Sequence, residues 1–148
     1  MTIDEAFEIL RSLPKDWGAS EEDVCAVESK LGVRLPSPLR ELMLRTGRGM
    51  HMQWLFPEGS IPPLHQLVDL QEIALEILEE DPPSLRPTFP FVTLEVHQGY
   101  EFVFARAGLQ DHDAEVFYYR ERDGFGPCVG SSLRSHIAAA VQRAMARG

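Results

Sequence analysis

Apolar residues near the amino terminus recur every three or four positions, the spacing that places side chains on one face of a helix. Thr2 and Glu5 have the spacing of a capping box, in which two side chains satisfy free backbone N–H groups at a helix start. This pattern predicts a helix over about residues 3–13, and Pro14 is expected to break it.

Two more helices are predicted on either side of a short elbow with the sequence LGVRLP, residues 31–36. The first covers residues 21–31, with Ser20 as its capping residue, and the second covers residues 38–46. Gly32 suits the left-handed conformation that often ends a helix. Because these local signals agree with one another, we predict a rigid helix–elbow–helix unit.

The middle of the chain is predicted to contain one strand and one helix. We expect a strand at residues 50–56, followed by a proline-containing loop. Asp69 and Glu72 repeat the capping-box spacing, and apolar residues then recur at helical intervals. A helix is therefore predicted from Asp69 to about Glu80, and the Asp-Pro-Pro sequence that follows stops it.

The second half of the chain alternates apolar and polar residues, which is the period of a β-strand. Strands are expected at residues 92–96 and 101–104, joined into a hairpin by a tight turn at residues 98–99. A third strand is expected at residues 115–120, and a short fourth one near Cys128. These strands predict an antiparallel sheet.

A final helix closes the predicted fold, and Ser131 or Ser132 is expected to cap it. The elements together predict an α+β fold in a single domain over residues 1–148. It has amino-terminal helices, an antiparallel sheet of about four to six strands and a carboxyl-terminal helix. The residues expected to face inward from that last helix are Leu133, Ile137, Ala140, Val141 and Met145.

The composition fits a globular protein, since the chain has 148 residues of which 44% are hydrophobic. No apolar run approaches the length needed to span a membrane. Acidic residues follow Met1 where a secretory signal needs positive charge. We therefore expect a cytoplasmic protein without a membrane partner.

The net charge of -9 argues against direct binding to nucleic acid, because phosphates would be repelled by most of the surface. Negative charge is concentrated between Gly49 and Leu85, a stretch without any Lys or Arg. A basic protein partner is the natural complement of such a surface. The acids of this stretch are Glu58, Asp69, Glu72, Glu76, Glu79, Glu80 and Asp81.

The sequence offers few residues for catalysis or metal binding. Neither cysteine has a metal-type or redox-type spacing, the histidines are scattered, and the serines near His136 lack a nucleophile-elbow pattern. Asp111, His112 and Asp113 with Glu115 are possible metal ligands, but a solvated turn before a strand explains them more simply. We expect no metal, no cofactor and no enzymatic activity.

The predicted binding residues combine acids with aromatic anchors. Acids at spacings of three and four on one helix repel each other by a few tenths of a kcal/mol per pair, which favours a basic partner, although a charge run is also compatible with a merely solvated face. Large aromatic side chains concentrate binding energy at interfaces. The predicted partner-binding residues are Glu72, Glu76, Glu79, Glu80, Trp54, Asp111, Asp113 and Tyr118.

One ordered set of residues carries a family resemblance. The chain contains, in this order, an acidic helix residue, Leu-Gly, Leu-Pro and an amphipathic helix that ends at glycine. The resemblance extends over about residues 20–146 and includes the later strands. This arrangement resembles the SUKH superfamily, typified by the yeast Smi–Knr regulators of cell-wall synthesis. The motif residues are Glu28, Leu31, Gly32, Leu35, Pro36, Gly47 and Gly49.

The resemblance implies a function as well as a fold. Many bacterial SUKH domains are immunity proteins, so the resemblance implies a non-enzymatic protein that neutralises a cognate toxin by occlusion, with a basic toxin domain as its partner. A regulatory domain that binds an endogenous protein is the alternative, followed by a small metal-dependent hydrolase. The motif residues themselves are expected to shape the elbow rather than to bind the partner.

Overall fold

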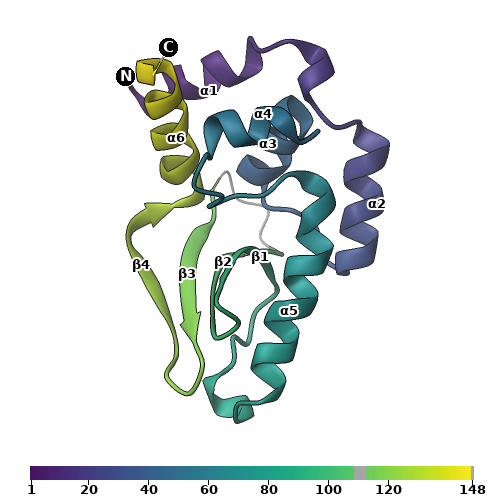
Figure 1. The fold of residues 1–148 in the computed structure, drawn as a ribbon, viewed down its shortest axis with the longest axis vertical. Coiled ribbons are helices and arrows are strands. Elements are labelled where there is room, and N and C mark those ends of the chain that lie inside the picture. Colours follow the sequence, from purple (N-terminus) through teal and green to yellow (C-terminus); the bar gives the residue numbers. More distant parts are fainter. Residues whose placement is uncertain (109–112, 148) are drawn as a thin grey trace.

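The computed structural model of the protein describes residues 1–108 and 113–147 and confirms the α+β fold (Figure 1). Single turns of 3-10 helix occur at η1 (Lys15–Trp17), η2 (Leu64–Gln66) and η3 (Pro83–Leu85). The α-helices and strands are, in order, α1 (Ile3–Arg11), α2 (Glu21–Leu31), α3 (Ser37–Thr46), α4 (Met50–Leu55), α5 (Leu67–Glu79), β1 (Phe91–His97), β2 (Glu101–Arg106), β3 (Glu115–Arg120), β4 (Gly124–Ser132) and α6 (Leu133–Arg147).

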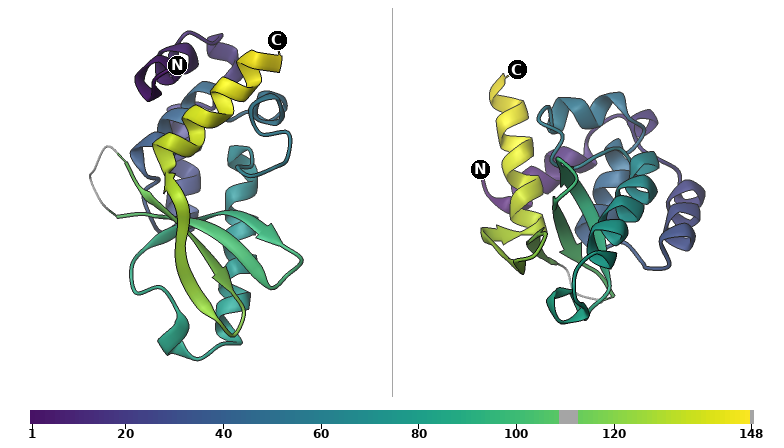
Figure 2. Two further views of the ribbon diagram at one scale, coloured as in Figure 1. Left: turned by 90° about the vertical axis from the view of Figure 1, so that its left-hand side faces the viewer. Right: turned by 60° about the horizontal axis from the view of Figure 1, so that its bottom comes forward.

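The four strands form an antiparallel meander in the order β1-β2-β3-β4. Helix α5 packs along one face of this sheet, mainly over β1; in the left view of Figure 2 the helix lies behind the strands. Helices α1, α3, α4 and α6 gather at one end of the sheet, where both chain termini also lie (Figures 1 and 2). The sheet therefore has one face under α5 and another that the helical end covers only in part.

The start signals of the first two helices and the stop signal of α2 act as predicted, whereas α1 ends at Arg11, before the predicted residue 13. Thr2 and Glu5 form a complete capping box at the start of α1. The hydroxyl of Ser20 accepts a hydrogen bond from the backbone N–H of Asp23, and α2 has the predicted bounds. Gly32 ends α2 with a φ angle of 73°, a left-handed value that favours glycine.

The elbow between α2 and α3 is held by one acidic side chain, that of Glu28. One of its carboxylate oxygens accepts a hydrogen bond of 2.7 Å from the backbone N–H of Leu35. The other lies 3.5 Å from the guanidinium of Arg40. Because the Glu28 side chain is nearly buried, these contacts tie the end of α2 to the start of α3.

Replacing Glu28 by alanine should lower the free energy of unfolding by about 2 kcal/mol, because the N–H of Leu35 loses a charged acceptor in a partly buried place. Urea unfolding measures the change. Glu22→Ala is the matched control, since Glu22 is exposed on the same helix, and it should change stability by less than about 0.5 kcal/mol. Equal losses in the two variants would contradict a clamping role for Glu28.

The strand predicted at residues 50–56 is wrong, because these residues form helix α4 instead. Its buried side chains are Met52, Leu55 and Phe56, which lie three and four positions apart and so share one helical face. A strand would have divided them between two faces. The N–H of Phe56 donates to the carbonyl of Met52, which completes the turn.

Two smaller differences concern helix ends and faces. Helix α5 begins at Leu67, directly after η2, so Asp69 lies inside its first turn and does not cap it. Ser132 caps α6 as predicted, since its hydroxyl accepts from the N–H of Ser135. Met145 is exposed, against expectation, because Ala144 takes the inward position at the end of that helix.

Gln71 holds α5 against the edge of the sheet. Its side-chain amide donates to the carbonyl of Phe91 at 3.0 Å, and its carbonyl oxygen accepts from the N–H and the hydroxyl of Thr93, each at 2.8 Å. Strand β1 is an edge strand, and Gln71 occupies the place of a neighbouring strand beside it. Gln71 and Thr93 are both buried, so the contact is shielded from water.

A second buried anchor lies just beyond the end of α5. The carboxylate of Asp81 accepts hydrogen bonds from the hydroxyl of Tyr119 on β3 and from the N–H of Arg122 in the following turn. The Tyr119 hydroxyl and the N–H of Arg122 lower the pKa of Asp81. Burial, together with Asp81, raises the pKa of Tyr119. The two anchors fix α5 at both ends over a core of aromatic side chains from the sheet.

Candidate binding surfaces

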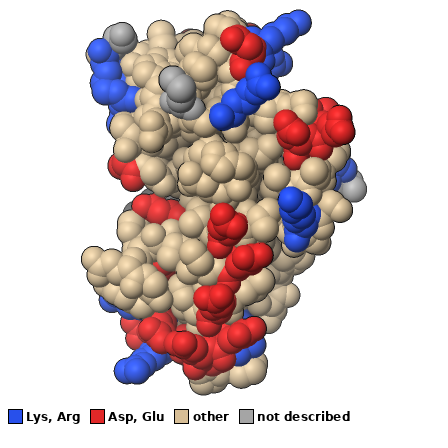
Figure 3. All heavy atoms as spheres, turned by 45° about the vertical axis from the view of Figure 1, so that its right-hand side comes forward, with Lys and Arg blue, Asp and Glu red and all other residues tan. Residues whose placement is uncertain are grey.

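The outward side of α5 carries four carboxylates, Glu72, Glu76, Glu79 and Glu80, which we call the acidic face. All four side chains are exposed, as is that of Asp69 one turn earlier. Figure 3 shows acidic side chains as a row along this part of the surface. The opposite side of the helix is buried against the sheet and the helical end, and consists of Leu67, Gln71, Ala74, Ile77 and Leu78.

The acidic face carries uncompensated charge. In the part of the chain that the structure describes, no Lys or Arg side chain lies within ion-pairing distance of these four carboxylates. Ile73 and Leu75 flank the row and leave 38% and 46% of their surfaces exposed. The acidic face therefore combines negative charge with exposed apolar side chains.

The aromatic residue predicted for this surface, Trp54, lies elsewhere. It belongs to α4 at the helical end, where its ring meets that of Trp17 edge-on with centroids 5.9 Å apart. Trp17 in turn stacks on His51 at 3.8 Å, and the carbonyl of Trp54 accepts from Arg147 near the end of α6. The half-buried Trp54 side chain therefore packs helices together at the opposite end from the last turns of α5.

Of the two predicted binding acids near residue 112, the structure describes Asp113. The carboxylate of Asp113 accepts from the N–H of Arg134 at 3.0 Å and from the N–H of Ala114 at 2.8 Å. Asp113 thereby satisfies a free backbone group in the first turn of α6. Asp111 lies outside the described residues.

Tyr118 is half exposed and lies on the sheet face opposite α5. Its neighbour Tyr119 points into the aromatic core under α5, and successive side chains of a strand point to opposite faces. The predicted binding residues that the structure describes are thus separated into three places: the acidic face, the helical end and the sheet face opposite α5, which we call the open face.

The open face carries an acid, Glu95, that sequence reasoning missed. A bulge between Thr93 and Glu95 adds one residue to β1 opposite β2, so Glu95 points to the face opposite the aromatic core. Its carboxylate lies 2.9 Å from His97. Burial, opposed in part by His97, raises the pKa of Glu95.

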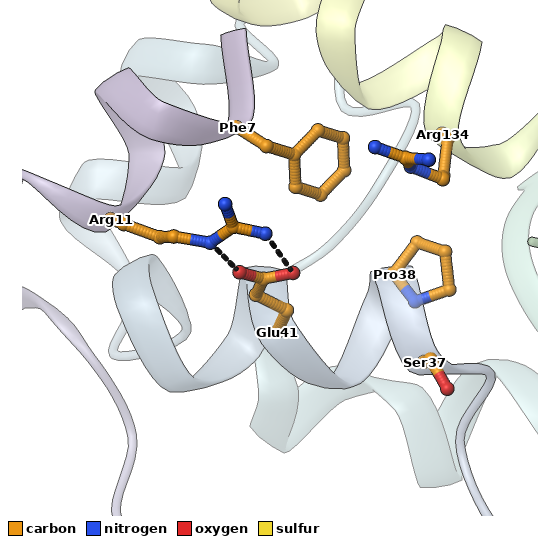
Figure 4. A pocket seen from close by; sticks show the side chains of 6 residues that line it. All are labelled: Phe7, Arg11, Ser37, Pro38, Glu41 and Arg134. Carbon is orange, nitrogen blue, oxygen red and sulfur yellow. Dashed lines mark hydrogen bonds and ion pairs between the residues drawn. The ribbon is translucent and has the colours of Figure 1, made fainter. Parts of the chain in front are cut away.

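A hollow of about 180 Å³ lies between α1, α3 and α6 (Figure 4). Arg11 reaches across it and donates two hydrogen bonds to Glu41, at 2.5 and 3.5 Å. Arg134 lies over the ring of Phe7 and pairs with Asp4 at 3.0 Å. Both arginines of the hollow are thus paired with acids of the same chain. None of the residues that line the hollow is an activated nucleophile; they are Phe7, Arg11, Ser37, Pro38, Glu41 and Arg134.

Over residues 1–108 and 113–147 no group of three or more His, Cys, Asp or Glu side chains is placed to hold a metal ion. Among the described helices, none has the length and apolar character required to cross a membrane.

Comparison with known protein families gives a match over most of the chain. The model of the SMI1 / KNR4 family (SUKH-1) matches residues 18–138, from just before α2 into α6. The matched region contains the elbow, the acidic face and the whole sheet. No curated protein and no solved structure matches the chain.

Proposed function

Because the chain belongs to the SMI1 / KNR4 family (SUKH-1), we propose that it is an immunity protein that binds and neutralises a cognate bacterial toxin. The protein acts by occlusion and performs no reaction of its own. Its SUKH membership supports a role in protein–protein interaction, and α5 offers an exposed charged surface for it.

The observation that carries the proposal is the unpaired acidic face of α5. Glu72, Glu76 and Glu79 lie on successive turns, so their carboxylates form a continuous strip of negative charge. Such a strip attracts a basic surface over a distance of about 8 Å at physiological salt and raises the rate of encounter. Fast association suits an inhibitor that must act before its target does damage.

Charge reversal of the acidic face tests this proposal. Changing Glu72, Glu76, Glu79 and Glu80 to lysine should weaken binding to the toxin at least about 100-fold, because attraction to a basic surface becomes repulsion. Survival of cells that co-express the protein with candidate secreted toxins gives the first readout, and surface plasmon resonance with the purified pair gives the second.

The matched control reverses four exposed acids elsewhere, Asp16, Glu22, Asp23 and Asp123, which gives the same change in net charge. These lie outside α5, and circular dichroism verifies that both variants are folded. The control should keep the protection given by the unmodified protein. Unchanged protection by the α5 variant would remove the acidic face as the binding surface. If the protein co-purifies with an endogenous protein and gives no protection against any toxin, the result would favour the alternative of a regulatory domain.

A further inference from the structure

A hollow of about 160 Å³ lies between α4 and the loop that leads to η2, and we call it the α4 hollow. Its floor consists of Met52, Phe56 and Ile61, three buried apolar residues of the main core. An apolar cavity of about 150 Å³ is large enough to hold a benzene molecule. The α4 hollow therefore has room for one leucine or phenylalanine side chain.

None of the described residues that line the α4 hollow is charged. Its polar residues are Gln53 and Gln66, which are both exposed at the rim. Glu58 belongs to the same loop, but its carboxylate accepts from the hydroxyl of Ser60 at 3.0 Å and lies 3.7 Å from Arg143. An apolar side chain of a partner can therefore enter the hollow without leaving a charge unpaired.

Short-range contacts hold the α4 hollow in its shape. The N–H of Gly59 donates to the carbonyl of Phe56 at 2.9 Å, and the N–H of Gln66 donates to the carbonyl of Pro63 at 3.1 Å. The ring of Phe56 lies parallel to that of His136 on α6, with centroids 6.5 Å apart. A site that is formed before binding costs less entropy to occupy.

The α4 hollow lies at the amino-terminal end of α5, into which its loop leads (Figure 1). Gln66 lines the hollow and directly precedes α5 with a helical backbone conformation. Asp69 is three residues further on and Ile73 is seven, so both lie on the same side of the helix as Gln66. Side chains three residues apart on a helix are separated by about 5–6 Å. An exposed acid, Asp69, therefore stands one helical turn from the rim of the hollow.

The acids beyond the hollow attract a basic segment. Asp69, Glu72 and Glu76 are exposed, and no described Lys or Arg side chain lies within ion-pairing distance of them. An extended chain advances about 3.3 Å per residue. A residue two positions from a side chain in the hollow therefore reaches Asp69, and one four positions away reaches the acidic face.

We propose that the α4 hollow receives one leucine-sized or phenylalanine-sized side chain of the toxin. Basic residues two and four positions away on the same segment lie over Asp69 and the acidic face. A side chain held in a well-packed pocket and surrounded by polar contacts is typical of an interface hot spot. This inference rests on the proposed function, because the basic toxin supplies the segment, and it adds the contact that determines where along α5 the toxin binds.

Nuclear magnetic resonance titration tests the hollow with the peptide acetyl-Ser-Phe-Ser-Arg-Ser-Arg-amide and with the same residues in reverse order, which covers both chain directions. Two matched probes replace Phe by Ala, or both arginines by neutral citrulline. The better of the two Phe peptides should move the methyl signals of Met52 and Ile61. It should bind at least about fivefold more tightly than its Ala counterpart, because the ring buries apolar surface. Citrulline should weaken binding about threefold, as expected for contacts with exposed carboxylates.

Three variants separate the hollow from the acids beside it. Gln53→Phe should remove the difference between the Phe and Ala peptides, because Gln53 is exposed at the rim and a ring there closes the hollow. Ser29→Phe is the matched control, since Ser29 is exposed on α2 outside the hollow, and the difference should persist. Asp69→Asn should reduce the effect of citrulline and leave the effect of the Phe ring. Circular dichroism verifies that each variant is folded.

The peptide comparison on the unmodified protein decides between the outcomes without any variant. Equal binding of the Phe and Ala peptides, or signal changes confined to α5, would overturn the hollow as a site and leave the proposed function untouched. Phe-dependent binding at Met52 and Ile61 without protection against any toxin would instead overturn the toxin partner alone. With a toxin that the protein neutralises, Gln53→Phe should weaken binding at least about tenfold, and an unchanged affinity would overturn the role of the hollow.

Discussion

Replacing Gln71 by leucine is expected to lower the free energy of unfolding by about 4 kcal/mol, the largest loss we predict for a single side chain. The variant removes three hydrogen bonds at once, to the carbonyl of Phe91 and to the N–H and hydroxyl of Thr93. All these groups are buried, so water does not replace the lost partner, and each unsatisfied group costs about 1–3 kcal/mol. Leucine has similar volume and helix propensity, so the loss reports hydrogen bonding rather than packing.

Urea unfolding followed by circular dichroism measures this effect, and hydrogen exchange locates it. The N–H of Thr93 should lose protection, since it faces the side of β1 that has no neighbouring strand. Gln53→Leu is the control, because Gln53 is exposed on α4 and should change stability by less than about 0.5 kcal/mol. A loss below about 1 kcal/mol for the Gln71 variant would show that the contact does not hold α5 to the sheet.

Replacing Gly18 by alanine is expected to cost about 3 kcal/mol, for a steric reason. An added Cβ would lie 1.7 Å from the carbonyl oxygen of Leu44 and 2.6 Å from its carbonyl carbon. These are backbone atoms of α3, so no side chain can rotate away. The segment that contains Gly18 must therefore move away from α3. This movement weakens the neighbouring hydrogen bond of 3.0 Å, which the N–H of Ala19 donates to the carbonyl of Met43.

Gly59→Ala is the matched control for the Gly18 variant. Gly59 has a φ angle of 79°, and an added Cβ meets nothing within 4 Å, so this substitution costs only the backbone strain of about 1 kcal/mol. Thermal unfolding of both variants gives the comparison. A smaller loss of stability for the Gly18 variant than for the Gly59 variant would show that α3 moves easily and that the close contact is not rigid.

The features that sequence reasoning predicted well are those determined by near neighbours in the chain. The capping hydroxyl of Ser20 contacts a group three residues away, and Gly32 ends a helix through its own φ angle. Such signals are complete within a few residues, so the bounds of α2 follow directly. The acidic face could be predicted from the sequence for the same reason, because helical spacing alone places Glu72, Glu76 and Glu79 on one side of the helix.

The features that were missed depend on long-range contacts. Gln71 reads as an ordinary polar residue of an amphipathic helix, and only the packing of α5 beside β1 shows that it bonds to a strand edge. Helix α4 was mistaken for a strand because six residues are too few to separate the two periods. Alternation alone places Glu95 on the same face as Thr93, and only the bulge between these two residues moves it to the other face.

The two long sides of α5 are chemically independent of each other. Gln71 and the buried apolar residues hold the helix from within, whereas the four outward carboxylates form no ion pair with the described Lys and Arg residues. Substitutions on the outward side can therefore accumulate without loss of stability. We expect sequence divergence among close homologues to concentrate at these positions, and the same freedom makes the helix a scaffold for retargeting to a new partner.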